Sequence, residues 1–109
     1  MVTVTFRRDS RNRLSSVFAE GHAGWADPGQ DVVCAAASAI LQAAWLGLAE
    51  YAHVDVEGER TGGLLAMRWP EAAREREDVR AIVATAELSI ARIAHDFPQH
   101  VRTRSAKEP

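Results

Sequence analysis

Hydrophobic and polar residues alternate at the start of the chain. Val2, Val4 and Phe6 are separated by polar residues, and this period of two is typical of a half-buried β-strand. Turn-forming residues follow at 9–12, and a second strand-like segment occupies 14–20. The pattern therefore predicts an N-terminal β-hairpin.

The longest apolar stretch covers positions 32–49 and is hydrophobic on nearly every side of a helix, so we predict a helix over 32–52. Its length alone would allow a membrane span. However, seven of these residues are alanine, Ser38 and Gln42 interrupt the stretch, and strands are predicted on both flanks. We therefore predict no membrane segment, and a helix buried between a sheet and either a second layer or a partner subunit.

The second half of the chain repeats the alternation of strand and helix. Alternating hydrophobic residues at 54–56 and 65–69 flank a turn at 59–63, which predicts a second hairpin. Apolar residues at helical spacing over 79–97 predict a second helix, which Pro98 ends.

The end of the chain completes the predicted fold. Residues 99–104 predict a short closing strand, and 105–109 a disordered tail. The fold prediction is thus a single α+β domain over 1–104, with element order ββαββα(β) and two helices packed on a mainly antiparallel sheet.

Composition narrows the possible functions. The 109 residues carry a net charge of −2, which argues against a surface that is basic overall, and we expect no direct nucleic-acid binding. The single cysteine cannot form an internal disulfide, and this favours a reducing, cytoplasmic location. The four histidines show no metal-ligand spacing, and no dinucleotide or phosphate-loop motif is present, so we expect neither a metal nor a cofactor.

The candidate chemistry lies around the only cysteine, Cys34. If Asp31 caps the helix, Cys34 falls in the first helical turn, where the helix dipole favours a thiolate. His22, across a loop over 23–30, would supply a base or an imidazolium partner. Residue types alone give about equal weight to a second interpretation, in which Cys34 is a buried structural cysteine near an unrelated histidine.

Ser38 and Gln42 share a helical stripe with Cys34, because they follow it at i+4 and i+8. In one interpretation Ser38 faces the site and supports it by hydrogen bonding. In the other, Ser38 bonds the carbonyl four residues before it.

These motifs resemble a known family. Gly21-His22-Ala23, then Gly24 and the aromatic Trp25, and then Asp31-Val32-Val33-Cys34-Ala35-Ala36 with Ser38 are similar to the bacterial ribosomal-processing cysteine proteases, the Prp family. The turn at 62–63 and the segment at 97–98 that follows the late helix extend the likeness to nearly the whole chain.

The resemblance implies a homodimeric cysteine endopeptidase that removes the N-terminal extension of a large-subunit ribosomal protein precursor. It assigns catalysis to His22 and Cys34. We expect Gly21, Asp31 and Ser38 to support that pair, and a loop containing Gly24, Trp25 and Gly29 to contact substrate. Two alternatives stay open: a non-catalytic ribosome-associated binding module, and a single-thiol redox or acyl-carrying switch.

Overall fold

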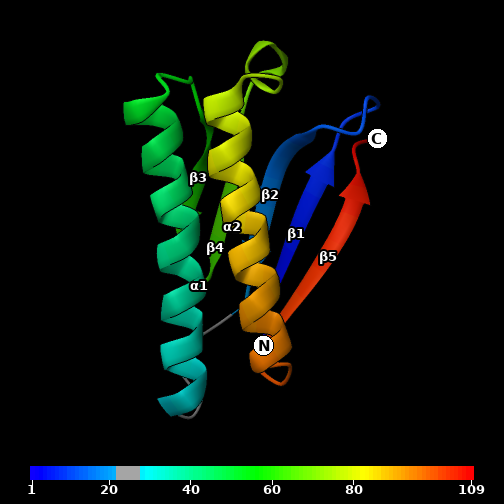
Figure 1. The fold of residues 1–109 in the computed structure, drawn as a ribbon. Coiled ribbons are helices and arrows are strands. Elements are labelled where there is room, and N and C mark those ends of the chain that lie inside the picture. Colours follow the sequence, from blue (N-terminus) through cyan, green and yellow to red (C-terminus); the bar gives the residue numbers. More distant parts are fainter. Residues whose placement is uncertain (22–27) are drawn as a thin grey trace.

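A computed structural model of the chain describes residues 1–21 and 28–109, and for 28–31 it describes the backbone alone. Five strands form one sheet, and two long helices cover one of its faces (Figure 1). The elements, in chain order, are β1 (Val2–Arg8), β2 (Leu14–Glu20), α1 (Pro28–Leu46), η1 (Gly47–Tyr51), β3 (Glu57–Thr61), β4 (Leu64–Arg68), η2 (Glu71–Ala73), α2 (Glu77–Asp96) and β5 (Val101–Lys107). The predicted α+β class and element order are confirmed.

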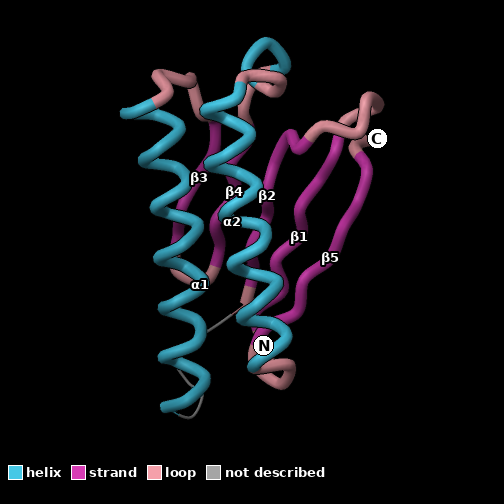
Figure 2. The backbone as a smooth tube through the Cα atoms, viewed as in Figure 1, coloured by secondary structure: helices cyan, strands magenta, loops and turns pink. Residues whose placement is uncertain are grey.

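The sheet has the strand order β3-β4-β2-β1-β5 (Figure 2). The two hairpins β1–β2 and β3–β4 are antiparallel, and so is the β2–β4 pairing that joins them. β5 runs parallel to β1, with Val2 opposite Val101. The sheet is therefore mixed, because α2 carries the chain back to the end of the sheet where β1 begins.

Several element boundaries differ from the predicted ones. The second hairpin turns at Gly62-Gly63, because cross-strand pairing already begins at Thr61 and Leu64. The first strand of this hairpin, β3, begins at Glu57, directly after the segment 54–56 that was predicted to form it. β5 reaches Lys107, and the Glu108 N–H donates to the Arg8 carbonyl, so the tail predicted to be disordered from 105 instead extends the strand along β1.

The core lies between the sheet and the helices. α1 contributes Ala37, Leu41 and Ala44 from one face, and its continuation η1 contributes Leu48, which is fully buried. Within the described residues, Val32–Tyr51 is the one helical segment long and apolar enough to cross a membrane, but a third of that stretch is buried inside the domain. Ile40 and Trp45 are partly buried against the core, whereas Val32 and Leu46 are exposed.

The end of the sheet farthest from the α1 N-terminus is held by polar contacts. The Asp9 carboxylate accepts hydrogen bonds from the backbone N–H groups of Arg11 and Arg13. It also accepts from the side chains of Arg13 and Arg74. Arg74 also donates twice to the Trp69 carbonyl, at 3.2 and 2.9 Å. This buried cluster joins the β1–β2 turn to the segment that leads into α2.

Candidate active site

Cys34 lies on the buried face of α1, with 7% of its surface exposed. It is the seventh residue of the helix, because α1 begins at Pro28. Proline suits this first helical position, since the N–H it lacks would have no partner there. The predicted start near Val32 is therefore wrong by about one turn.

This earlier start corrects three predictions. Asp31 lies within the helix and is not its N-cap, and Gly29 lies in the helix and not in the loop. Only the first four N–H groups of a helix lack a partner within it, and Cys34 lies beyond them, so its N–H is used within α1. The effect of the helix dipole is confined to the first turn, so Cys34 does not lie where the sequence predicted that effect to act.

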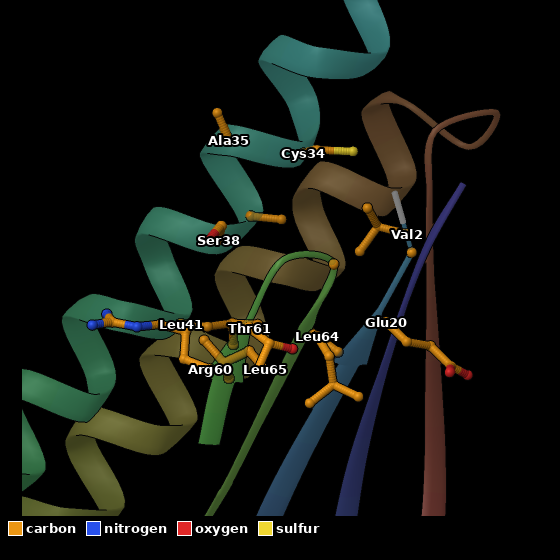
Figure 3. A pocket seen from close by; sticks show the side chains of 14 residues that line it. Val2, Glu20, Cys34, Ala35, Ser38, Leu41, Arg60, Thr61, Leu64 and Leu65 are labelled. Carbon is orange, nitrogen blue, oxygen red and sulfur yellow. The ribbon is translucent and has the colours of Figure 1, made fainter. Parts of the chain in front are cut away.

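Cys34 lines a cavity of about 280 Å³ between α1 and the neighbouring strand ends (Figure 3). The described lining is mostly apolar. It consists of Val2, Ala19, Glu20, Gly21, Cys34, Ala35, Ala37, Ser38, Leu41, Arg60, Thr61, Gly63, Leu64 and Leu65. Such a cavity can hold an apolar group next to the thiol.

Two glycines form the strand-end wall of the cavity. The Gly21 N–H donates to the Gly63 carbonyl at 3.1 Å, which ties the end of β2 to the β3–β4 turn. Gly21 has a φ of 138°, and a Cβ there would lie 2.3 Å from the Met1 carbonyl oxygen. Only glycine fits this position at the end of β2.

Ser38 lies one helical turn after Cys34 and also lines the cavity. Gln42 Nε2 donates to Ser38 Oγ at 2.7 Å, and Arg60 Nη1 of β3 donates to Gln42 Oε1 at 2.5 Å. Among the described residues, Ser38 Oγ makes no hydrogen bond to the carbonyl four residues before it. The structure therefore favours the interpretation in which Ser38 faces the site.

The remaining predicted site residues, His22, Gly24 and Trp25, lie outside the described residues. His53 and His95 are exposed, and His95 contacts the neighbouring Asp96, so neither belongs to this cavity. Within the described ranges, no cluster of three His, Cys, Asp or Glu side chains could hold a metal ion.

The sequence did not single out Arg60 or Leu41 as site residues. Leu41 follows Cys34 by seven residues, a spacing that returns to the same helical face, so its position was available from the sequence. Arg60 reaches the site only through the register of β3 against β4 and the packing of that hairpin beside α1, which no local pattern encodes.

A mixed sheet covered on one face by two helices, with a buried thiol beside an apolar cavity, defines an α+β domain with a cysteine-centred site. The family model for the cysteine protease Prp matches residues 1–102. The chain therefore belongs to the Prp family and is a cysteine protease. This match confirms the resemblance found in the sequence.

Individual relatives agree with this assignment. The ribosomal processing cysteine protease Prp of Staphylococcus aureus (strain NCTC 8325 / PS 47) is 27% identical over 105 residues, which cover 94% of this chain and 96% of that protein. The crystal structure of SMU.848 from Streptococcus mutans is 27% identical, with a TM-score of 0.88 over 99% of this chain and 96% of that one.

The S. aureus Prp structure in complex with a substrate peptide shares the fold. Its TM-score is 0.86 at 21% identity, over 96% of this chain and 99% of that one.

Proposed function

We propose that this protein is an endopeptidase that uses Cys34 and His22 to remove the N-terminal extension of a large-subunit ribosomal protein. The observation that carries the proposal is the position of Cys34: the only cysteine of a Prp-family chain lines an apolar cavity. The names of the S. aureus relatives, ribosomal processing proteases, support the substrate class.

In this proposal His22 takes the proton from the Cys34 thiol, and the sulfur attacks the carbonyl carbon of the scissile peptide bond. The C–N bond then breaks, His22 returns the proton to the leaving amine, and the new N-terminus departs. Water hydrolyses the thioester that remains on Cys34 and regenerates the thiol. Asp31 orients His22, and the loop with Gly24 and Trp25 contacts the peptide.

Cleavage of a peptide that spans the extension junction of the host ribosomal protein tests this function. Replacing the thiol in Cys34→Ala should abolish cleavage while the melting temperature stays close to that of the native protein. Cys34→Ser, which keeps a polar atom of similar size, is the matched control for packing and should also be inactive. An active Cys34→Ala variant would refute the proposed mechanism.

Alkylation of Cys34 separates the protease from the alternative functions. A thiol activated by His22 should react with iodoacetamide rapidly well below the ordinary thiol pKa of about 8.5. Slow labelling that follows an ordinary thiol profile, together with no cleavage, would instead indicate a non-catalytic binding module. Rapid labelling without cleavage would indicate a thiol switch.

We further propose that the protein forms a homodimer through the outward face of α1. Val32 is 69% exposed and Leu46 57%, and alanines fill the exposed positions between them. Val32, Ala39 and Leu46 recur every seven residues, a spacing that keeps one apolar stripe facing a partner helix. A contiguous exposed stripe of this kind favours association.

Sedimentation at several concentrations tests the dimer. Leu46→Glu should shift the protein to monomers, because a charge would be buried in the interface. Leu88 is 71% exposed on α2, so Leu88→Glu is the matched control and should leave the dimer intact. Equal sedimentation of the two variants would contradict an interface on α1.

We also propose a cytoplasmic location, which a reduced nucleophile and a ribosomal substrate both support. Cell fractionation tests it. Recovery in the membrane fraction would instead point to a membrane role for the apolar helical segment.

A further inference from the structure

A chain of hydrogen bonds with a defined direction ends on the hydroxyl of Ser38. Arg60 Nη1 contacts Gln42 Oε1, and Gln42 Nε2 contacts Ser38 Oγ (2.5 and 2.7 Å). The contacts join β3 to α1 across the rim of the cavity, and both Ser38 and Arg60 line it (Figure 3).

The chemistry of arginine fixes the direction of the whole chain. A guanidinium group only donates hydrogen bonds, so the amide oxygen of Gln42 must face Arg60 and the amide nitrogen must face Ser38. The amide nitrogen also only donates, so Ser38 Oγ accepts this bond. Its own proton is therefore directed elsewhere, and no described residue accepts it.

We propose that Arg60 and Gln42 hold Ser38 as a hydrogen-bond donor to the carbonyl oxygen of the peptide that Cys34 attacks. The inference rests on Cys34 as the nucleophile. Cys34 and Ser38 lie one helical turn apart on α1 and both line the cavity, so a peptide carbonyl bound in that cavity lies within reach of both side chains. Ser38 then supplies a donor to the developing oxyanion, which the N–H of Cys34 cannot do because it is used within α1.

In this arrangement Ser38 touches the substrate, whereas Gln42 and Arg60 are positioning residues that act through it. The attacked carbonyl oxygen gains negative charge as the sulfur–carbon bond forms. A donor already oriented toward it stabilises that charge without reorganisation. The effect should therefore appear in kcat and less in KM.

The decisive variant is Gln42→Glu, which keeps the shape of the side chain and reverses one hydrogen bond. A carboxylate still accepts from Arg60, but it can only accept from Ser38 as well, so the hydroxyl proton turns away from the substrate. We expect kcat to fall roughly 100-fold with KM within about twofold of the native value, as for the loss of one oxyanion donor. Gln99→Glu makes the same charge change at an exposed position and should leave both constants unchanged.

Three further measurements distinguish donation from simple packing. Ser38→Ala should lose about as much kcat as Gln42→Glu, and the double variant should lose no more than either, because all three remove the same bond. The melting temperature of Gln42→Glu should not fall, since the contact with Arg60 is kept. Gln42→Lys combined with Arg60→Glu restores a donor next to Ser38 and should recover most of kcat.

Native kcat in Gln42→Glu, or in Ser38→Ala, would overturn the proposal. So would a Gln42→Glu variant whose loss of activity simply adds to that of Ser38→Ala. Activity in Cys34→Ala would instead refute the proposed nucleophile, so the two failures remain distinguishable.

Discussion

Arg74 belongs to a buried ion pair. Replacing it by methionine should destabilise the protein more than the same replacement of an arginine in one of the exposed ion pairs described. The Arg74 side chain is 5% exposed and the Asp9 side chain 7%, with 3.0 Å between Nη1 and the carboxylate. The change removes one donor from Asp9 and two from the Trp69 carbonyl, and leaves a buried carboxylate with fewer partners.

Breaking a buried ion pair from one side costs about 3–5 kcal/mol of unfolding free energy. For a domain of this size that corresponds to a melting temperature lower by roughly 10–20 °C. Arg92→Met is the matched control, because Arg92 forms an exposed pair with Asp96 on α2 and is 78% exposed. Exposed pairs contribute about 0–1 kcal/mol, so this variant should melt within a few degrees of the native protein.

The loss of stability in Arg74→Met should also depend on pH. Burial raises the pKa of the Asp9 carboxyl, but hydrogen bonds from Arg13, Arg74 and Arg11 outweigh burial and hold the pKa well below its usual range. Because the folded pKa is lowered, Asp9 stabilises the fold above the ordinary aspartate pKa of about 4, and this contribution is lost as the pH falls further. Arg74→Met should lose less stability than the native protein over that acidic range.

Urea unfolding followed by circular dichroism at neutral pH and at pH 3 measures both effects. A neutral-pH loss below about 1 kcal/mol for Arg74→Met, equal to that of Arg92→Met, would show that the cluster does not stabilise the fold as argued. An unchanged acid dependence would show that Arg74 does not lower the pKa of Asp9.

Two backbone predictions complete the set. Gly21→Ala should lower the unfolding free energy measured in urea by about 2 kcal/mol or more and reduce peptide cleavage, because the new Cβ would lie 2.3 Å from the Met1 carbonyl oxygen. In the control Gly62→Ala, the new Cβ meets nothing within 4 Å, so the unfolding free energy should change by less than about 0.5 kcal/mol. His53→Gly should raise the unfolding free energy by about 0.5–1 kcal/mol, because His53 has a φ of 55° just after η1. His95→Gly, inside the last turn of α2, should instead lower it by about 1 kcal/mol, and stabilisation by both glycines would contradict this explanation.

Local patterns in the sequence were sufficient to predict most of the helices and strands. Strict alternation predicted β1 and β2, and helical spacing followed by Pro98 predicted α2 and its end. The parallel pairing of β5 was not predictable, because a seven-residue strand with few apolar residues gives no sign of which neighbour it will join. That pairing depends on where α2 returns the chain.

The site was predictable where one helix supplies its residues. The i, i+4, i+8 spacing placed Cys34, Ser38 and Gln42 on one stripe, and the first two line the cavity. The helix start was missed because both Pro28 and Asp31 are favourable residues for a helix N-terminus, and the sequence offers no way to choose between them. Arg60 was missed because its contact with Gln42 spans 18 positions and depends on packing between a strand and a helix.

The first residues of the chain have a practical consequence for work with the recombinant protein. Val2 lines the cavity and the Met1 carbonyl lies against Gly21, whereas β5 ends at the opposite end of the sheet (Figure 1). An affinity tag fused ahead of Met1 would emerge next to the thiol, where it can compete with peptide or be cut by the enzyme itself. Purification handles therefore belong after Pro109.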